Sequence, residues 1–208
     1  ALEDIAERSE ERVRARQPVR AELSREEARW YQGHTLKELA GLLEELRKEP
    51  DTRRRKLLEM VFSAIVVKFS LQRADTAQRQ VDKRIRKGLP TEFFVRRGQE
   101  LVERWRALNE ALPSAPKAPR VRVGDASKLP KLLTRKDTLE RVDLIITSPP
   151  YGGTYDYVDH HARRYPWLGI DPTPFAQGEI GARRRSQSKG AKKRWDRELG
   201  DVLRSMSS

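Results

Sequence analysis

Apolar residues recur along the first half of the chain with a helical period. They fall every three or four residues across 36–46, and a longer, more apolar run follows across 52–72. A third run extends from Phe93 to Leu112, and the charge-dense segment 1–17 has the composition of a solvated helix. We therefore predict that this half of the protein is a layer of helices.

Polar residues stand where these helices are expected to begin. Ser24, Thr35 and Thr91 each precede a helical pattern, and each side chain has an oxygen that can accept a hydrogen bond from a helix N-terminal amide. Pro50-Asp51 ends one helix and starts the next. The stretch 73–88 is highly polar and rich in cations, so we predict an exposed loop or lid there.

The pattern changes after 113–119, a boundary that contains three prolines. Two short runs rich in β-branched residues follow. Residues 120–123 are predicted to be a strand, and 142–147, which is apolar without alternation, is typical of a buried parallel strand. We therefore expect an α/β fold with a helical region at 1–118 and a sheet-containing region at 119–208.

The second predicted strand runs into Ser148-Pro149-Pro150-Tyr151, where the prolines forbid both helix and further strand pairing. Gly152-Gly153 then gives a flexible exit. The carboxyl end of a buried strand is where open α/β sheets bind ligands. The exocyclic amine of cytosine or adenine is a poor nucleophile, and a site that activates it needs acceptors aimed at its hydrogens. Ser148 Oγ and the Pro149 carbonyl are such acceptors, and Tyr151 can stack on a base swung out of a duplex.

Charge favours a nucleic-acid partner. The 208 residues include 44 lysines and arginines against 31 acidic residues, a formal net charge of +13. An arginine-rich coding bias would raise the charge without any nucleic acid. A cationic stretch near the C-terminus is expected to contact DNA phosphates, with a solvated charged helix as the alternative; its candidate residues are Arg183, Arg184, Arg185, Lys192, Lys193 and Arg194.

Other features narrow the class of protein. The chain has no cysteine, which excludes disulfides and thiolate zinc sites and fits a cytoplasmic location. No apolar run is long enough to span a membrane. Asp159, His160 and His161 are adjacent, so on a helix they point in different directions and cannot chelate one metal ion. We expect no metal site.

The sequence TSPPY, following an apolar run, resembles the catalytic motif of the amino-group DNA methyltransferases, which methylate N4 of cytosine or N6 of adenine using S-adenosylmethionine. The serine form is more similar to the cytosine-N4 branch, and the resemblance extends over 147–171. It implies that Ser148, Pro149, Pro150 and Tyr151 are catalytic and that the target base is flipped out of duplex DNA.

A second motif precedes this one by one βα unit. Gly124, Asp125 and Ala126 resemble the family motif that borders the adenine of S-adenosylmethionine. These three residues are equally typical of a turn that caps a helix at 127–133.

The family also needs a glycine-rich loop of the FxGxG kind to hold the methionine end of the cofactor, and no stretch of the sequence matches it. We therefore expect a partial Rossmann-like methyltransferase sheet of few strands, with 1–118 as a large, mainly α-helical N-terminal insertion. On this interpretation the chain is a fragment or a truncated product, and a partner chain or a missing segment completes the cofactor site.

Three functions remain open. The first is an S-adenosylmethionine-dependent DNA methyltransferase. The second is a catalytically inactive DNA-binding or assembly protein derived from such an enzyme. The third is methylation of RNA or of protein glutamine, and the asparagine that glutamine methyltransferases prefer at the Ser148 position counts against the latter.

Overall fold

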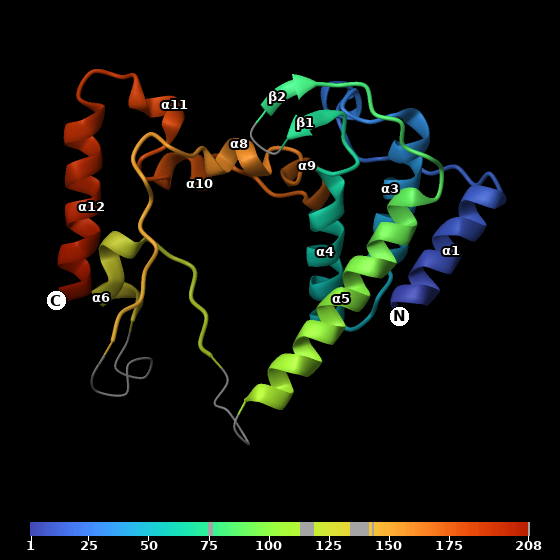
Figure 1. The fold of residues 1–208 in the computed structure, drawn as a ribbon, viewed down its shortest axis with the longest axis horizontal. Helices are drawn as coiled ribbons and strands as arrows, with labels where there is room; N and C mark the ends of the chain where they lie inside the picture. Colours follow the sequence, from blue (N-terminus) through green and yellow to red (C-terminus); the bar gives the residue numbers. More distant parts are fainter. Residues whose placement is uncertain (75–76, 113–118, 134–141, 143, 208) are drawn as a thin grey trace. The chain divides into compact units, whose positions relative to one another are not determined.

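The computed structural model describes residues 1–74, 77–112, 119–133, 142 and 144–207. The structure is mostly helical, with one small antiparallel sheet of two strands among the described residues. The chain divides into two compact units (Figure 1). The first unit comprises Ala1–Ser114 and Asp159–Asp171, and the second comprises Ala115–Val158 and Pro172–Ser208.

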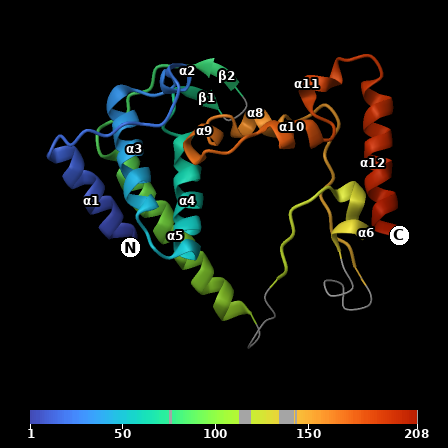
Figure 2. The ribbon, with the colours of Figure 1, turned by 180° about the vertical axis from the view of Figure 1, so that it is seen from behind.

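The long helices of the first unit are α1 (Leu2–Arg14), α3 (Gly33–Arg47), α4 (Thr52–Val66) and α5 (Leu89–Ala111). Helix α3 contacts the other three, and Figure 2 shows it between α1 and α4. Its apolar face is fully buried, and the largest buried side chains around it are Ile5, Leu39, Leu42, Leu46, Phe62 and Phe94. The helical layer predicted from periodicity is thus confirmed, although α5 buries only the first part of its apolar run, since Val102, Trp105 and Leu108 are 39%, 43% and 53% exposed.

Only some of the predicted N-cap residues begin helices in the structure. Ser24 Oγ accepts a hydrogen bond from Glu27 N at 3.1 Å, which caps α2 (Arg25–Ala28), and Asp51 Oδ1 accepts from Arg54 N at 2.8 Å, which caps α4. The predicted caps at Thr35 and Thr91 are wrong. Both residues lie inside helices whose N-caps are Gln32 and Gly88.

The N-terminus of α5 is capped from another helix. Glu38, which is 6% exposed, accepts hydrogen bonds from Gly88 N at 3.1 Å, from Thr91 N at 3.0 Å and from Thr91 Oγ1 at 2.8 Å. A carboxylate at this position also complements the positive end of the helix dipole. The acceptor that α5 needs therefore comes from α3 rather than from its own sequence.

One element of the first unit differs from the predictions. Part of the predicted loop at 73–88 is a pair of antiparallel strands, β1 (Gln72–Ala74) and β2 (Ala77–Gln80). Two short helices lie later in the chain, α8 (Tyr157–His161), which begins in the second unit, and α9 (Tyr165–Leu168). A left-handed Gly169, with φ +63°, ends α9.

Trp167 explains why 159–171 belong to the first unit. Its ring is 3% exposed and makes edge-to-face contacts with Tyr31 at 5.5 Å and with Phe62 at 5.7 Å between centroids. Burial raises the pKa of the Tyr31 hydroxyl above its ordinary value. Nearby, the Arg163 guanidinium lies 4.2 Å from the centre of the Trp30 ring.

Within the described residues of the second unit, the long helix α12 (Ala191–Ser207) packs on the short turn η1 (Ala126–Lys128) and on α6 (Leu129–Leu132). Helices α10 (Thr173–Gly178) and α11 (Arg183–Ser186) complete its described regular structure. No helix in the described part of the chain has the length and apolar character that crossing a bilayer requires.

The strands predicted at 120–123 and 142–147 are wrong for the residues that the structure describes. Residues 120–123, 142 and 144–147 pair in no ladder, and Val121, Val123 and Ile146 are 82%, 98% and 87% exposed. A strand with apolar side chains on both faces needs neighbouring strands, and this unit offers none among its described residues. Asp143 lies outside the described residues.

Candidate nucleic-acid interface

The loop that follows the predicted catalytic strand is held at its exit. Thr154 N donates to Tyr151 O at 3.2 Å, which closes a turn, and Gly153 N donates to Gly181 O at 2.9 Å. Gly153 has φ +71°, a left-handed backbone that favours glycine. Ser148 is exposed, and the Tyr151 side chain is 64% exposed. The loop thus presents its serine and its aromatic ring to solvent.

Trp195 of α12 fixes this loop against the rest of the unit. Its indole Nε1 donates to the Pro150 carbonyl at 3.4 Å, and its ring lies against two glycines. A Cβ atom added to Gly152 would lie 3.1 Å from the ring, and one added to Gly181 would lie 2.8 Å from it. The Gly152 that the sequence suggested as a flexible exit is therefore part of a packed contact.

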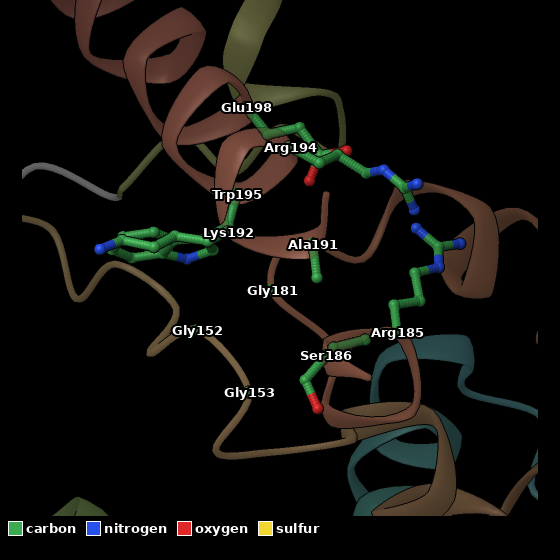
Figure 3. Close-up of a pocket in the computed structure, with 11 residues that line it drawn as sticks. Gly152, Gly153, Gly181, Arg185, Ser186, Ala191, Lys192, Arg194, Trp195 and Glu198 are labelled. Carbon is green, nitrogen blue, oxygen red and sulfur yellow. The ribbon is translucent and has the colours of Figure 1, made fainter. Parts of the chain in front are cut away.

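A cavity of about 320 Å³ opens beside this contact (Figure 3). It is lined by Gly152, Gly153, Gly181, Ala182, Arg185, Ser186, Ala191, Lys192, Arg194, Trp195 and Glu198. The guanidinium groups of Arg185 and Arg194 extend toward the same side of it in Figure 3. Three cations against the Glu198 carboxylate give the lining a net positive charge, which suits an anionic ligand such as a phosphate.

Lys192 and Arg194 lie in the first turn of α12, together with Lys193. Cations at a helix N-terminus are disfavoured by the helix dipole, and no acidic residue occupies this first turn. Among the described residues, none forms an ion pair with Lys192, Lys193 or Arg194. A bound anion would relieve this unfavourable arrangement.

Arg184 has a structural partner inside the protein. Its guanidinium donates to Glu179 Oε2 at 2.5 Å and also to Asp156, and its backbone N donates to Asp156 Oδ2 at 2.8 Å. Asp156 and Glu179 are 3% and 6% exposed. Burial alone would lower the pKa of Arg184, but the bonds to Glu179 and Asp156 outweigh it and raise the pKa. The Arg184 guanidinium is therefore engaged by two carboxylates of its own unit.

The two neighbours of Arg184 differ from it and from each other. Arg185 donates to the backbone carbonyls of Ala176 at 2.7 Å and of Glu179 at 3.4 Å, which position its guanidinium without neutralising its charge. Arg183 is exposed, does not line the cavity, and contributes a backbone bond from its N to Tyr155 O at 3.0 Å. Three adjacent arginines thus have three environments.

Gly124, Asp125 and Ala126 form a helix-capping turn, the alternative that the sequence left open. Asp125 Oδ1 accepts from Ser127 N at 3.0 Å and from Ser127 Oγ at 2.7 Å, and these bonds hold the pKa of Asp125 below its ordinary value. A Cβ atom on Gly124 would lie 2.4 Å from the Leu132 side chain. None of the three residues lines the cavity. The role of the three residues beside the adenine of S-adenosylmethionine stays a prediction.

Sequence reasoning missed the residues that shape this site. The pattern of the sequence singles out none of Trp195, Glu198, Gly181 and Asp156. An acidic residue or a tryptophan within a strongly basic stretch was the available signal. No group of three or more potential metal ligands occurs among the residues that the structure describes.

Comparison of this chain with protein-family models, with curated proteins and with solved structures finds no match.

Proposed function

We propose that this chain carries the target-base side of an S-adenosylmethionine-dependent DNA methyltransferase acting on cytosine N4 or adenine N6. One observation carries the proposal. Tyr151 is exposed between Pro150, whose carbonyl is bonded by Trp195, and Gly152, which lines the cationic cavity. An exposed aromatic ring therefore lies one residue from the lining of a pocket whose charge suits a phosphate, and this supports the stacking of a flipped base on Tyr151.

In this proposal each group of residues has a separate role. Lys192 and Arg194 bind a phosphate of the target strand, and Tyr151 stacks on the flipped base. Ser148 Oγ and the Pro149 carbonyl accept hydrogen bonds from the exocyclic amine and orient its lone pair. The resemblance supplies S-adenosylmethionine as the methyl donor and a Rossmann-like sheet as the expected fold. A partner chain or a further segment supplies the cofactor loop.

The phosphate pocket is tested with a matched pair of charge reversals on α12. K192E/R194E changes two residues that line the cavity, whereas K193E/R197E makes the same change of charge on the same helix outside the cavity. Binding of a labelled duplex is measured by fluorescence anisotropy over a range of salt. Log affinity falls as log salt rises, and each phosphate contact contributes about 0.9 to the steepness of this fall. We therefore expect the slope to become shallower by about 1.8 in K192E/R194E, which loses two contacts.

The control variant should lower the slope by clearly less. Equal losses for both variants would show that the charge of the helix, rather than the cavity, attracts DNA.

Methyl transfer is tested with radiolabelled S-adenosylmethionine and mixed-sequence duplex DNA. Y151A should abolish incorporation if the chain, alone or with a partner, is active. F175A removes an exposed aromatic ring of the same unit that does not line the cavity, and it should retain the wild-type rate. Equal rates for Y151A and an active wild type would exclude the catalytic assignment.

A second candidate is DNA binding without catalysis, and the Asp125 cap favours it because the carboxylate is engaged by Ser127 and Lys128. Calorimetric titration with S-adenosylmethionine, with and without DNA, separates the candidates. Salt-dependent DNA binding without cofactor binding would support this second function for the isolated chain.

A further inference from the structure

The segment before the proline loop combines exposed aliphatic side chains with a backbone that belongs to no helix and follows a drawn-out path in Figure 1. Leu144, Ile145 and Ile146 are 74%, 46% and 87% exposed. Neighbouring side chains of an extended chain point to opposite faces, so both faces of this segment are apolar. Exposed apolar surface of this kind is typical of an interaction site.

The backbone of the same segment is also unpaired. From residue 144 to residue 149, no main-chain N–H or carbonyl forms a hydrogen bond within the part of the chain that the structure describes. A row of free donors and acceptors along an extended chain is a template for strand pairing. An apolar ligand would cover the side chains but would leave these groups unpaired. A β-strand satisfies both.

We propose that residues 144–148 form a docking strand that pairs, antiparallel, with the same strand of a second copy of this chain. With Ile146 opposite its own copy, Ile145 lies opposite Thr147 and Leu144 lies opposite Ser148, so all five residues of the strand are paired and the two Ile146 side chains meet at the centre. The sequence has no charged residue from Leu144 to Tyr151, so no like charges oppose each other along the pair. A two-fold interface of this kind closes on itself and stops at a dimer.

Two prolines limit the length of the docking strand, and a second apolar segment of the same unit can extend the sheet. Pro149 and Pro150 have no backbone N–H, so the ladder ends before them. A two-stranded ribbon alone is marginal in water. Val121 and Val123 of the same unit, 82% and 98% exposed, supply a second β-branched segment in each copy that can extend the sheet. This inference stands on exposure and backbone pairing, and it does not depend on methyl transfer.

The test measures oligomeric state on the full chain by analytical ultracentrifugation over a range of concentration and salt. We expect a concentration-dependent dimer that tightens as salt rises, because each copy carries a net charge of +13 and salt screens the repulsion. I146K should weaken association roughly tenfold or more, since it places a cation in the apolar pair. I170K makes the same change at an isoleucine that is 49% exposed elsewhere, and it should associate as the wild type does.

Hydrogen exchange identifies the paired residues. The amides of 145–147 should be protected in the dimer and should exchange freely in I146K, while the helical circular dichroism of both variants matches the wild type. A chain that stays monomeric at every concentration overturns the proposal, as does a dimer that I146K leaves intact. Protection of these amides in the monomer would also overturn it, because the strand would then pair within its own chain.

Discussion

Gly181 offers the sharpest test of how the candidate site is built. Its φ is +70°, and a Cβ atom added to it would lie 2.8 Å from Cδ1 and 3.0 Å from Nε1 of Trp195. Gly181→Ala therefore meets two separate penalties. The left-handed backbone disfavours any side chain, and the tryptophan must move to make room.

The two penalties can be estimated from the geometry. A left-handed residue with a Cβ atom costs about 1–2 kcal/mol relative to glycine. Overpacking against a ring in contact costs about 1–3 kcal/mol. We therefore expect Gly181→Ala to lower the free energy of unfolding of this unit by about 2–5 kcal/mol. Movement of the indole would also break its bond to the Pro150 carbonyl, now 3.4 Å long, and release the Tyr151 loop.

Gly178→Ala is the matched control, because its φ is not left-handed and its Cβ atom would have no neighbour within 4 Å. Unfolding in urea is followed by the indole N–H resonance of Trp195, assigned from a Trp195→Phe variant. Gly178→Ala should be neutral or slightly stabilising, since alanine restricts the unfolded chain. If Gly181→Ala matches Gly178→Ala in stability and leaves the Trp195 resonance unshifted, the packed glycine contact is wrong.

Three further predictions concern buried charge and packing. Burial would raise the pKa of Glu45, but hydrogen bonds from Lys48, Arg12 and Arg8 lower it to about 2. The lowered pKa stabilises the folded state by up to about 3 kcal/mol above about pH 4.5, and this stabilisation is lost as the pH falls toward 2. The difference in free energy of unfolding between the wild type and Glu45→Gln should therefore shrink on acidification. Arg184→Gln should cost about 3–5 kcal/mol in urea unfolding, because Asp156 and Glu179 stay buried without their partner, and Glu179→Gln added to it should recover part of the loss. Trp167→Ala should lower the thermal midpoint through a loss of about 3–5 kcal/mol, whereas Trp105→Ala, at a ring 43% exposed, should change it little.

The helices of the first unit were predictable because their signal is local. Apolar spacing marks the buried face of α3, and Ser24 and Asp51 cap the helices that directly follow them. Thr35 and Thr91 look equally suitable in sequence. The N-terminus of α5 is set by Glu38, whose carboxylate accepts hydrogen bonds from Gly88 and Thr91 although it lies fifty or more residues earlier in the chain. No local pattern contains that contact.

The pair of strands and the aromatic cluster have the same long-range origin. Strands β1 and β2 consist of alanine and polar residues, so the sequence has no alternation of apolar and polar side chains that would predict them. Trp167 was assigned to the catalytic region by its place in the chain. It packs instead on Tyr31 and Phe62, which lie more than a hundred residues earlier. Sequence order predicts contacts within an element better than contacts between elements.

The candidate site shows what charge patterns leave undetermined. Arg183, Arg184 and Arg185 form one cationic run in the sequence, and the run was predicted to contact phosphate as a whole. In the structure, two buried carboxylates neutralise Arg184, backbone carbonyls hold Arg185 at the cavity, and Arg183 stays in solvent. The folded partners, rather than the charges themselves, therefore determine which cation remains available to an anion. Lys192 and Arg194 meet that condition, because they line the cavity at a helix N-terminus without a carboxylate partner among the described residues. A phosphate contact in this chain should consequently lie on α12, and the charge reversals on that helix discriminate more sharply than any change within the arginine run.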